Sequence, residues 1–224
     1  MKKLFFALVG VAMVASSAVA QNYEKNLYGV RAGLNVASLL DQGMEVHSKT
    51  GFHIAGVYQR LLTESLPLYL ETGLQFSQKG FKVQSYEREP YNAMYLEIPV
   101  MVNYKFYIKD KVAIYPSIGV YYALGIGGKY QGEATESDVY ETVKCDMFGS
   151  NGIMKRSDFG MRFSATAEWR KFAFSLGYEF GFVDIAKNAD TGDVDYDDEY
   201  YGGNNSTFGK VKTGNFFISV GYNF

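Results

Sequence analysis

The sequence contains little of what metal, redox or nucleic-acid chemistry requires. It has one cysteine, Cys145, and two histidines, His47 and His53, so no disulfide can form within the chain and no Cys/His cluster has the spacing of a structural zinc site. Its 22 basic residues are scattered and the net charge is −2, which leaves no basic stripe for a phosphate backbone. These absences predict no metal, no cofactor and no nucleic-acid partner.

Proline and long apolar runs are also scarce. There are four prolines, and after residue 20 no apolar run approaches the ~20 residues that a membrane-spanning helix needs. Tyrosine, phenylalanine and glycine are abundant instead, with 19, 17 and 24 copies. This composition favours strands with tight bends over a helical bundle, and 224 residues fit one domain.

The N-terminus has the layout of a secretory signal. Two lysines precede an apolar run over residues 4–14, and small residues lead to an Ala-Val-Ala sequence that ends at Ala20. The alternative, a transmembrane anchor, is disfavoured because the apolar run is too short to span a bilayer. We therefore expect a signal peptide over 1–20, cleaved after Ala20, and an exported mature domain over 21–224.

Apolar and polar residues alternate with a period of two in eight segments, which is the pattern of β-strands. The polar faces carry glycine, alanine and serine with few charges, which suits the crowded interior of a narrow barrel better than a solvated exterior. The segments are close in length to a tilted membrane-spanning strand, which has ~9 to 11 residues. They cover residues 28–37, 52–59, 68–76, 94–106, 112–124, 159–169, 172–182 and 215–224.

Aromatic residues gather at both ends of the apolar faces, as expected for rings at the two membrane interfaces. The first ring comprises Tyr28, Tyr58, Tyr104, Trp169, Phe172, Tyr222 and Phe224. The second comprises Phe52, Phe76, Tyr122, Phe159, Phe182 and Phe216. Leucine, isoleucine, valine and alanine between the rings would face lipid. A soluble barrel would need the opposite arrangement, with its charged face in water.

The links between segments alternate long and short, which is typical of outer-membrane barrels with long external loops and short periplasmic turns. The links cover residues 38–50, 61–67, 78–92, 108–111, 126–157, 170–171 and 184–213. An even number of strands places both termini in the periplasm and closes every strand edge. The predicted fold is therefore an all-β, eight-stranded antiparallel up-and-down transmembrane β-barrel.

Three stretches resemble the PorT-like "porin family" of outer-membrane β-barrel proteins: Gly51-Phe52-His53, the run over residues 70–80, and residues 95–99. The resemblance implies a small barrel similar in architecture to the OmpX and OmpA types, in the outer membrane of a Gram-negative bacterium. A namesake of the family is linked to protein secretion. The closing residues resemble the terminal aromatic signal that the barrel-assembly machinery recognises, carried here by Val220, Tyr222 and Phe224.

Seven charged residues fall on the inward faces of the predicted strands. Eight strands enclose a lumen only just wide enough for side chains, so a packed ion-pair network is favoured over a path for solutes. The two-residue link over 170–171 places Arg162 opposite Glu179. The network comprises Arg31, Glu71, Glu97, Lys105, Arg162, Glu168 and Glu179.

Other polar residues support no strong site. His53 lies on the inward face near the external rim, but no G-x-S-x-G or other nucleophile motif accompanies it, and His47 is expected on the surface. Cys145, in the third external loop, is expected to be incidental. Acidic residues crowd the last external loop, yet they lack the glycine and the final glutamate of an EF-hand, so a solvated loop is favoured over a calcium site. They are Asp184, Asp190, Asp193, Asp195, Asp197, Asp198 and Glu199.

These observations predict a structural or interaction protein of the cell envelope and not an enzyme. Its partners would be outer-membrane lipid, the barrel-assembly machinery and an extracellular or envelope protein ligand, and the barrel would be a monomer. Two alternatives stay open: a narrow pore for small solutes, and a lipid-modifying enzyme at the rim that would depend on His53.

Overall fold

The computed structural model describes residues 23–40, 46–83, 89–108, 111–136, 139–149, 152–186 and 211–224. Within these ranges no helix is long and apolar enough to cross a membrane. The described residues form ten strands: β1 (Asn26–Leu40), β2 (Val46–Thr63), β3 (Leu66–Val83), β4 (Glu89–Tyr104), β5 (Phe106–Tyr107), β6 (Val112–Glu136), β7 (Val139–Asp146), β8 (Ser157–Trp169), β9 (Phe172–Gly181) and β10 (Lys212–Asn223).

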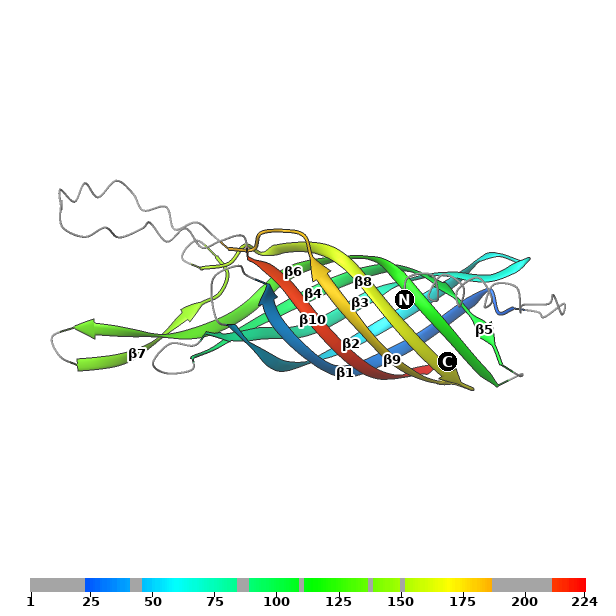
Figure 1. Cartoon of the computed structure of the whole chain (residues 1–224), viewed down its shortest axis with the longest axis horizontal. Helices are drawn as coiled ribbons and strands as arrows, with labels where there is room; N and C mark the ends of the chain where they lie inside the picture. Colours follow the sequence, from blue (N-terminus) through cyan, green and yellow to red (C-terminus); the bar gives the residue numbers. More distant parts are fainter. Residues whose placement is uncertain are drawn as a thin grey trace, which may run out of the picture.

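The strands close into an antiparallel barrel with eight positions around its wall, which confirms the predicted fold class. Each of β1, β2, β3, β8, β9 and β10 pairs with two neighbours, and pairing of β4 with β6 completes the wall. β5 follows β4 after Lys105 and pairs with β6 at the same position. β7 pairs with the far end of β6, and the two project from one end of the barrel, opposite β5 (Figure 1).

Alternation along each strand separates the two faces of the wall. In β1, Val30 and Leu34 point outward and are 44% and 52% exposed, whereas Arg31 and Asn35 are buried inside. The outward positions suit hydrocarbon, and the inward polar groups find partners across a narrow lumen. The expected aromatic contacts form near each end of the wall, for example between Phe172 and Tyr222.

Four of the expected links were predicted too long. Of the link over 38–50, β1 takes the part to Leu40 and β2 the part from Val46; of the link over 61–67, only two residues lie between β2 and β3. The link expected over residues 78–92 is largely strand, because β3 runs to Val83 and β4 begins at Glu89. The link expected over 126–157 contains the end of β6 and all of β7. Paired strands satisfy their own backbone hydrogen bonds, so they extend beyond the membrane without the apolar alternation that lipid demands.

Apolar residues close over the lumen at the end from which β6 and β7 project. This end is the external one, because the short turns lie at the opposite end. Phe148 and Met154 form an isolated bridge, and Met154 forms another with Ala186. Their side chains pack against Tyr95 and Tyr121 of the wall. We call this group the apolar cap: Met147, Phe148, Met154, Ile185, Ala186 and Val211.

Candidate functional site: the barrel lumen

Three buried charged residues and the largely buried Arg162 meet directly beneath the apolar cap, and we call them the outer cluster: Lys79, Glu97, Arg162 and Glu179. The Lys79 Nζ atom lies 2.6 Å from Glu97 Oε1 and 2.8 Å from Glu179 Oε2. Arg162 Nη1 lies 3.2 Å from Glu179 Oε1. Two cations therefore compensate two carboxylates at a point where the glutamates have almost no contact with solvent.

Neutral groups complete the surroundings of the outer cluster. Gln75 Nε2 donates a hydrogen bond of 2.7 Å to Glu97, and Asn215 Nδ2 donates one of 2.8 Å to Glu179. The Lys79 ammonium lies 5.0 Å from the ring centroid of Tyr121, and the Arg162 guanidinium lies 4.3 Å from that of Phe217. These contacts hold the cations against ring faces, which favours a single packed arrangement.

A second group, the inner cluster, lies toward the short-turn end and comprises Glu71, Lys105, Tyr115 and Glu168. Lys105 Nζ lies 2.9 Å from Glu168 Oε2, and Tyr115 donates a hydrogen bond of 2.9 Å to the same carboxylate. Asn223 Nδ2 donates another, also of 2.9 Å. Glu71 accepts hydrogen bonds from the side-chain amides of Gln59 and Asn103.

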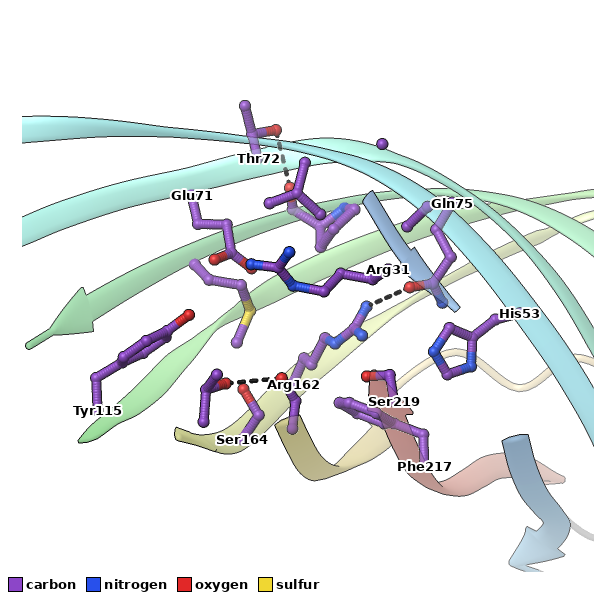
Figure 2. Close-up of a pocket in the computed structure, with 17 residues that line it drawn as sticks. Arg31, His53, Glu71, Thr72, Gln75, Tyr115, Arg162, Ser164, Phe217 and Ser219 are labelled. Carbon is purple, nitrogen blue, oxygen red and sulfur yellow. Dashed lines mark hydrogen bonds between the residues drawn. The ribbon is translucent and has the colours of Figure 1, made fainter. Parts of the chain in front are cut away.

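A cavity of about 30 Å³ is lined by Arg162 of the outer cluster and by Glu71 and Tyr115 of the inner cluster (Figure 2). Arg162 reaches Gln75 across it, whereas the Arg31 guanidinium lies toward Glu71. Arg31 Nη1 donates to the backbone oxygen of Val30, and Arg31 Nη2 has no hydrogen-bond partner among the described residues. A space of this size holds one or two water molecules.

Tyrosines gather at the short-turn end of the lumen. Tyr69 is fully buried, its hydroxyl lies 3.4 Å from that of Tyr107, and the Lys105 ammonium lies 4.9 Å from its ring centroid. Tyr23, which precedes β1, stacks on Tyr107 with ring centroids 5.6 Å apart. Aromatic rings therefore follow the inner cluster toward the periplasm.

All seven charged residues expected in the lumen lie on the inward face, but they do not form one network. Arg162 and Glu179 are directly paired across β8 and β9, which confirms the register deduced from the two-residue turn. Glu97 joins them in the outer cluster, and Lys105 pairs with Glu168 in the inner cluster. Among the described residues, neither Arg31 nor Glu71 has an oppositely charged side chain within 4 Å.

Sequence reasoning missed two buried charged residues of the lumen, Lys79 and Asp158. Lys79 falls in the external link expected over residues 78–92, because the apolar alternation of the third segment ends at Phe76. In the structure β3 continues to Val83, so Lys79 keeps the inward direction of Gln75 and Ser77. The available signal was this parity, since odd-numbered positions of that segment point inward.

His53 is held inside the wall. It is 2% exposed, its Nδ1 atom lies 2.9 Å from Asn35 Oδ1, and its ring is nearly perpendicular to that of Phe217, with the centroids 5.9 Å apart. No serine hydroxyl is recorded within hydrogen-bond distance of the His53 ring in the described part of the chain. The geometry is that of a packed polar residue.

Several other expectations fall wholly or partly outside the described residues. Residues 1–20 and the acidic positions from Asp190 to Glu199 lie outside them. Cys145 lies in β7, where its backbone pairs with that of Tyr130. Within the described ranges, no group of three His, Cys, Asp or Glu side chains is arranged to hold a metal ion.

The three residues of the expected assembly signal follow the outward face of the last strand. Val220, Tyr222 and Phe224 are 57%, 36% and 68% exposed. The rings of Tyr222 and Phe224 lie 5.8 Å apart, and the Phe224 amide donates to the backbone oxygen of Tyr28. Phe224 thus lies where β10 joins β1 and the barrel closes.

The fold and its two faces define the class of protein, an outer-membrane β-barrel with lipid-facing apolar residues outside and charged residues inside. The family model described as "Outer membrane protein beta-barrel domain" matches residues 19–187, and the chain belongs to that family. This membership supports a location in the outer membrane of Gram-negative bacteria. No curated protein matches the sequence.

Solved outer-membrane proteins are similar to this chain at low identity. Ail, the attachment invasion locus protein of Yersinia pestis, is 14% identical with a TM-score of 0.44, over 90% of this chain and 100% of Ail. Neisserial surface protein A is 13% identical with a TM-score of 0.45, over 90% and 100%. OprG from Pseudomonas aeruginosa is 13% identical with a TM-score of 0.46, over 92% and 99%. Likeness at this level says nothing of function.

Proposed function

We propose that this protein is a structural or interaction protein of the cell envelope. Its closed barrel holds the external segments at the cell surface, where they bind an extracellular or envelope protein, and it catalyses no reaction. The observation that supports this function is the filling of the lumen by the apolar cap, the outer cluster and the inner cluster in succession. A solute would have to displace buried ion pairs at two levels, which is costly.

The proposal extends to export, assembly and oligomeric state. The chain is exported by a signal peptide cleaved after Ala20, and the barrel-assembly machinery recognises Val220, Tyr222 and Phe224. The resemblance to the PorT-like family supports a role in envelope assembly or secretion. The apolar outward faces of the strands, bounded by aromatic rings, support a monomer surrounded by lipid.

Osmotic swelling of proteoliposomes tests the closed lumen against the narrow pore. Vesicles containing the refolded barrel are diluted into isotonic solutions of small sugars and amino acids, and light scattering is followed. We expect the same scattering as from protein-free vesicles. Faster swelling that scales with the amount of protein would establish the pore instead.

The variant His53→Ala tests the remaining alternative, an enzyme that modifies lipids. The proposal predicts the same envelope lipid composition in cells that carry the wild type, the variant or no copy of the gene. A lipid species that depends on the gene and disappears with His53→Ala, while folded barrel persists in the membrane, would establish the enzyme.

Deletion of Phe224 tests the assembly signal. The deletion should lower the yield of folded barrel in cells far more than it lowers stability after refolding in detergent, where no assembly machinery acts. Heat-shifted migration on a denaturing gel measures the folded fraction in both settings. Small, equal effects in cells and in detergent would remove Phe224 from the signal.

A further inference from the structure

Two periplasmic turns bring three basic residues to one sector of the barrel rim. The turn between β8 and β9 consists of Arg170 and Lys171, since Trp169 pairs directly with Phe172. The Arg170 amide donates a hydrogen bond of 2.8 Å to the backbone oxygen of Lys111, which precedes β6. Residues about 60 positions apart in sequence are thereby fixed next to each other.

Two of these cations rest on rings that face the membrane. The Arg170 guanidinium lies 5.4 Å from the ring centroid of Trp169, and the Lys171 ammonium lies 5.7 Å from that of Tyr222. Both rings belong to the aromatic girdle at the periplasmic interface and are 53% and 36% exposed. Side chains held this way keep their charges where hydrocarbon meets lipid headgroups.

No acidic group neutralises the three cations within the described part of the chain. None of Lys111, Arg170 and Lys171 has a carboxylate within 4 Å there, the C-terminal one included. The neighbouring Glu168 points into the lumen and pairs with Lys105. By contrast Lys25, a cation at the same end of the barrel, has an acidic partner in Glu64 at 2.6 Å.

The backbone at Arg170 gives an independent reason to look for a role of its side chain. Arg170 is the one non-glycine residue with positive φ in the described chain, at 56°. This left-handed conformation is unfavourable for a residue with a Cβ atom and is normally occupied by glycine or asparagine. The conformation of the turn therefore does not explain why an arginine stands at this position. An interaction made by the guanidinium group would explain it.

We propose that Lys111, Arg170 and Lys171 form a binding surface for the phosphate of an anionic phospholipid in the periplasmic leaflet. The two ring-supported cations and the adjacent lysine present positive charge that no described carboxylate pairs with, at the depth of the headgroups. The acyl chains would lie along the apolar wall beside Phe172 and Tyr222. The surface would anchor this sector of the barrel at the inner edge of the membrane, whatever the external segments bind.

Urea unfolding in vesicles of defined composition tests the surface. The full-length mature barrel is refolded in phosphatidylcholine vesicles with and without phosphatidylglycerol. We expect the anionic lipid to raise the ratio of folded to unfolded protein by about fivefold for each cation that it contacts. The double variant Arg170→Gln, Lys171→Gln should lose most of this gain, and salt should weaken the gain in the wild type.

A second double variant, Lys25→Gln with Arg60→Gln, is the matched control. It removes the same charge from the same end of the barrel but from another sector. It should keep the wild-type response to phosphatidylglycerol. An equal loss in both double variants would show a general charge effect, and an undiminished response in Arg170→Gln, Lys171→Gln would show that the turn does not bind lipid. Either result overturns the proposal.

The variant Arg170→Gly separates lipid binding from folding, because glycine accepts the turn conformation without strain. It should fold at least as well as the wild type in pure phosphatidylcholine, yet gain less from phosphatidylglycerol. A full wild-type gain in this variant would mean that the guanidinium makes no contact with the phosphate and would also contradict the proposal.

Discussion

The outer and inner clusters of the lumen neutralise their carboxylates in different ways. In the outer cluster Lys79 bridges two fully buried glutamates, Glu97 and Glu179, so two negative charges depend on one ammonium group and one guanidinium. In the inner cluster Glu168 has one cation and two neutral donors, Tyr115 and Asn223. The outer cluster therefore relies on charge compensation, and the inner cluster relies more on hydrogen bonds.

The difference follows from the surroundings of each cluster. The outer cluster lies beneath the apolar cap, where a carboxylate that loses its cation keeps a single neutral donor, Gln75 for Glu97 and Asn215 for Glu179. The inner cluster lies among tyrosine hydroxyls and side-chain amides that remain in place if the cation is removed. Replacing the lysine of the outer cluster should therefore lower the free energy of unfolding more than replacing the lysine of the inner cluster.

The largest effect is expected from Lys79→Met. Removal of the Lys79 ammonium leaves Glu97 without a cation and Glu179 with Arg162 alone, so the free energy of unfolding should fall by about 3 to 5 kcal/mol. Urea unfolding in vesicles, followed by fluorescence of the single tryptophan, Trp169, measures the change. Adding Glu97→Gln should restore part of the loss. A smaller loss of stability for Lys79→Met than for Lys105→Met would contradict the expected order of the two clusters.

A smaller loss, about 2 to 3 kcal/mol, is expected from Lys105→Met. The remaining Glu168 keeps the hydrogen bonds from Tyr115 and Asn223, which partly offset the missing cation. Adding Tyr115→Phe should then make the loss comparable to that in Lys79→Met. If the second substitution has no further effect, hydrogen bonds do not distinguish the inner cluster.

A double-mutant cycle on Arg162 and Glu179 sharpens the comparison within the outer cluster. Arg162→Met and Glu179→Gln should each destabilise the barrel, and the double variant should recover about 1 to 2 kcal/mol of their summed effect. The recovery is limited because Glu179 also contacts Lys79. Strictly additive losses would indicate that the 3.2 Å contact contributes no coupling.

The smallest effect is expected from Glu64→Gln, which breaks the exposed pair with Lys25. A hydrogen bond from Lys25 lowers the pKa of Glu64, so the pair stabilises the fold at neutral pH and loses that effect as the pH falls through the folded-state pKa. Both side chains are largely in solvent, which screens the interaction. The urea midpoint at pH 7 should not change measurably. A clear shift would mean that exposed and buried ion pairs differ less in their contribution to stability than the account requires.

Alternation alone was sufficient to predict the barrel wall and much of its interior. A period of two assigns each residue to one face, and the two-residue turn at Arg170 and Lys171 fixes the register of Arg162 with Glu179. These predictions succeed because lipid outside and a narrow lumen inside impose opposite demands on neighbouring positions.

The parts of the fold that lie outside the membrane show no comparable alternation in the sequence. β3 loses its apolar outward residues beyond Phe76 although the strand continues, so the inward position of Lys79 was missed. The apolar cap brings Met147 and Phe148 against Ile185 from another link, and no short-range periodicity reports such a contact. Nor does sequence spacing show that Arg31 lacks an ion-pair partner in the described chain, because that depends on distances across the lumen.

The central claim is that packed side chains close this barrel. Single-channel recording of the refolded wild-type protein in planar lipid bilayers tests it most directly. The account predicts a flat current at applied voltages of either sign, with insertion verified by heat-shifted migration of the same preparation. Reproducible current steps of a defined conductance from that preparation would contradict the claim and establish an open path through the lumen.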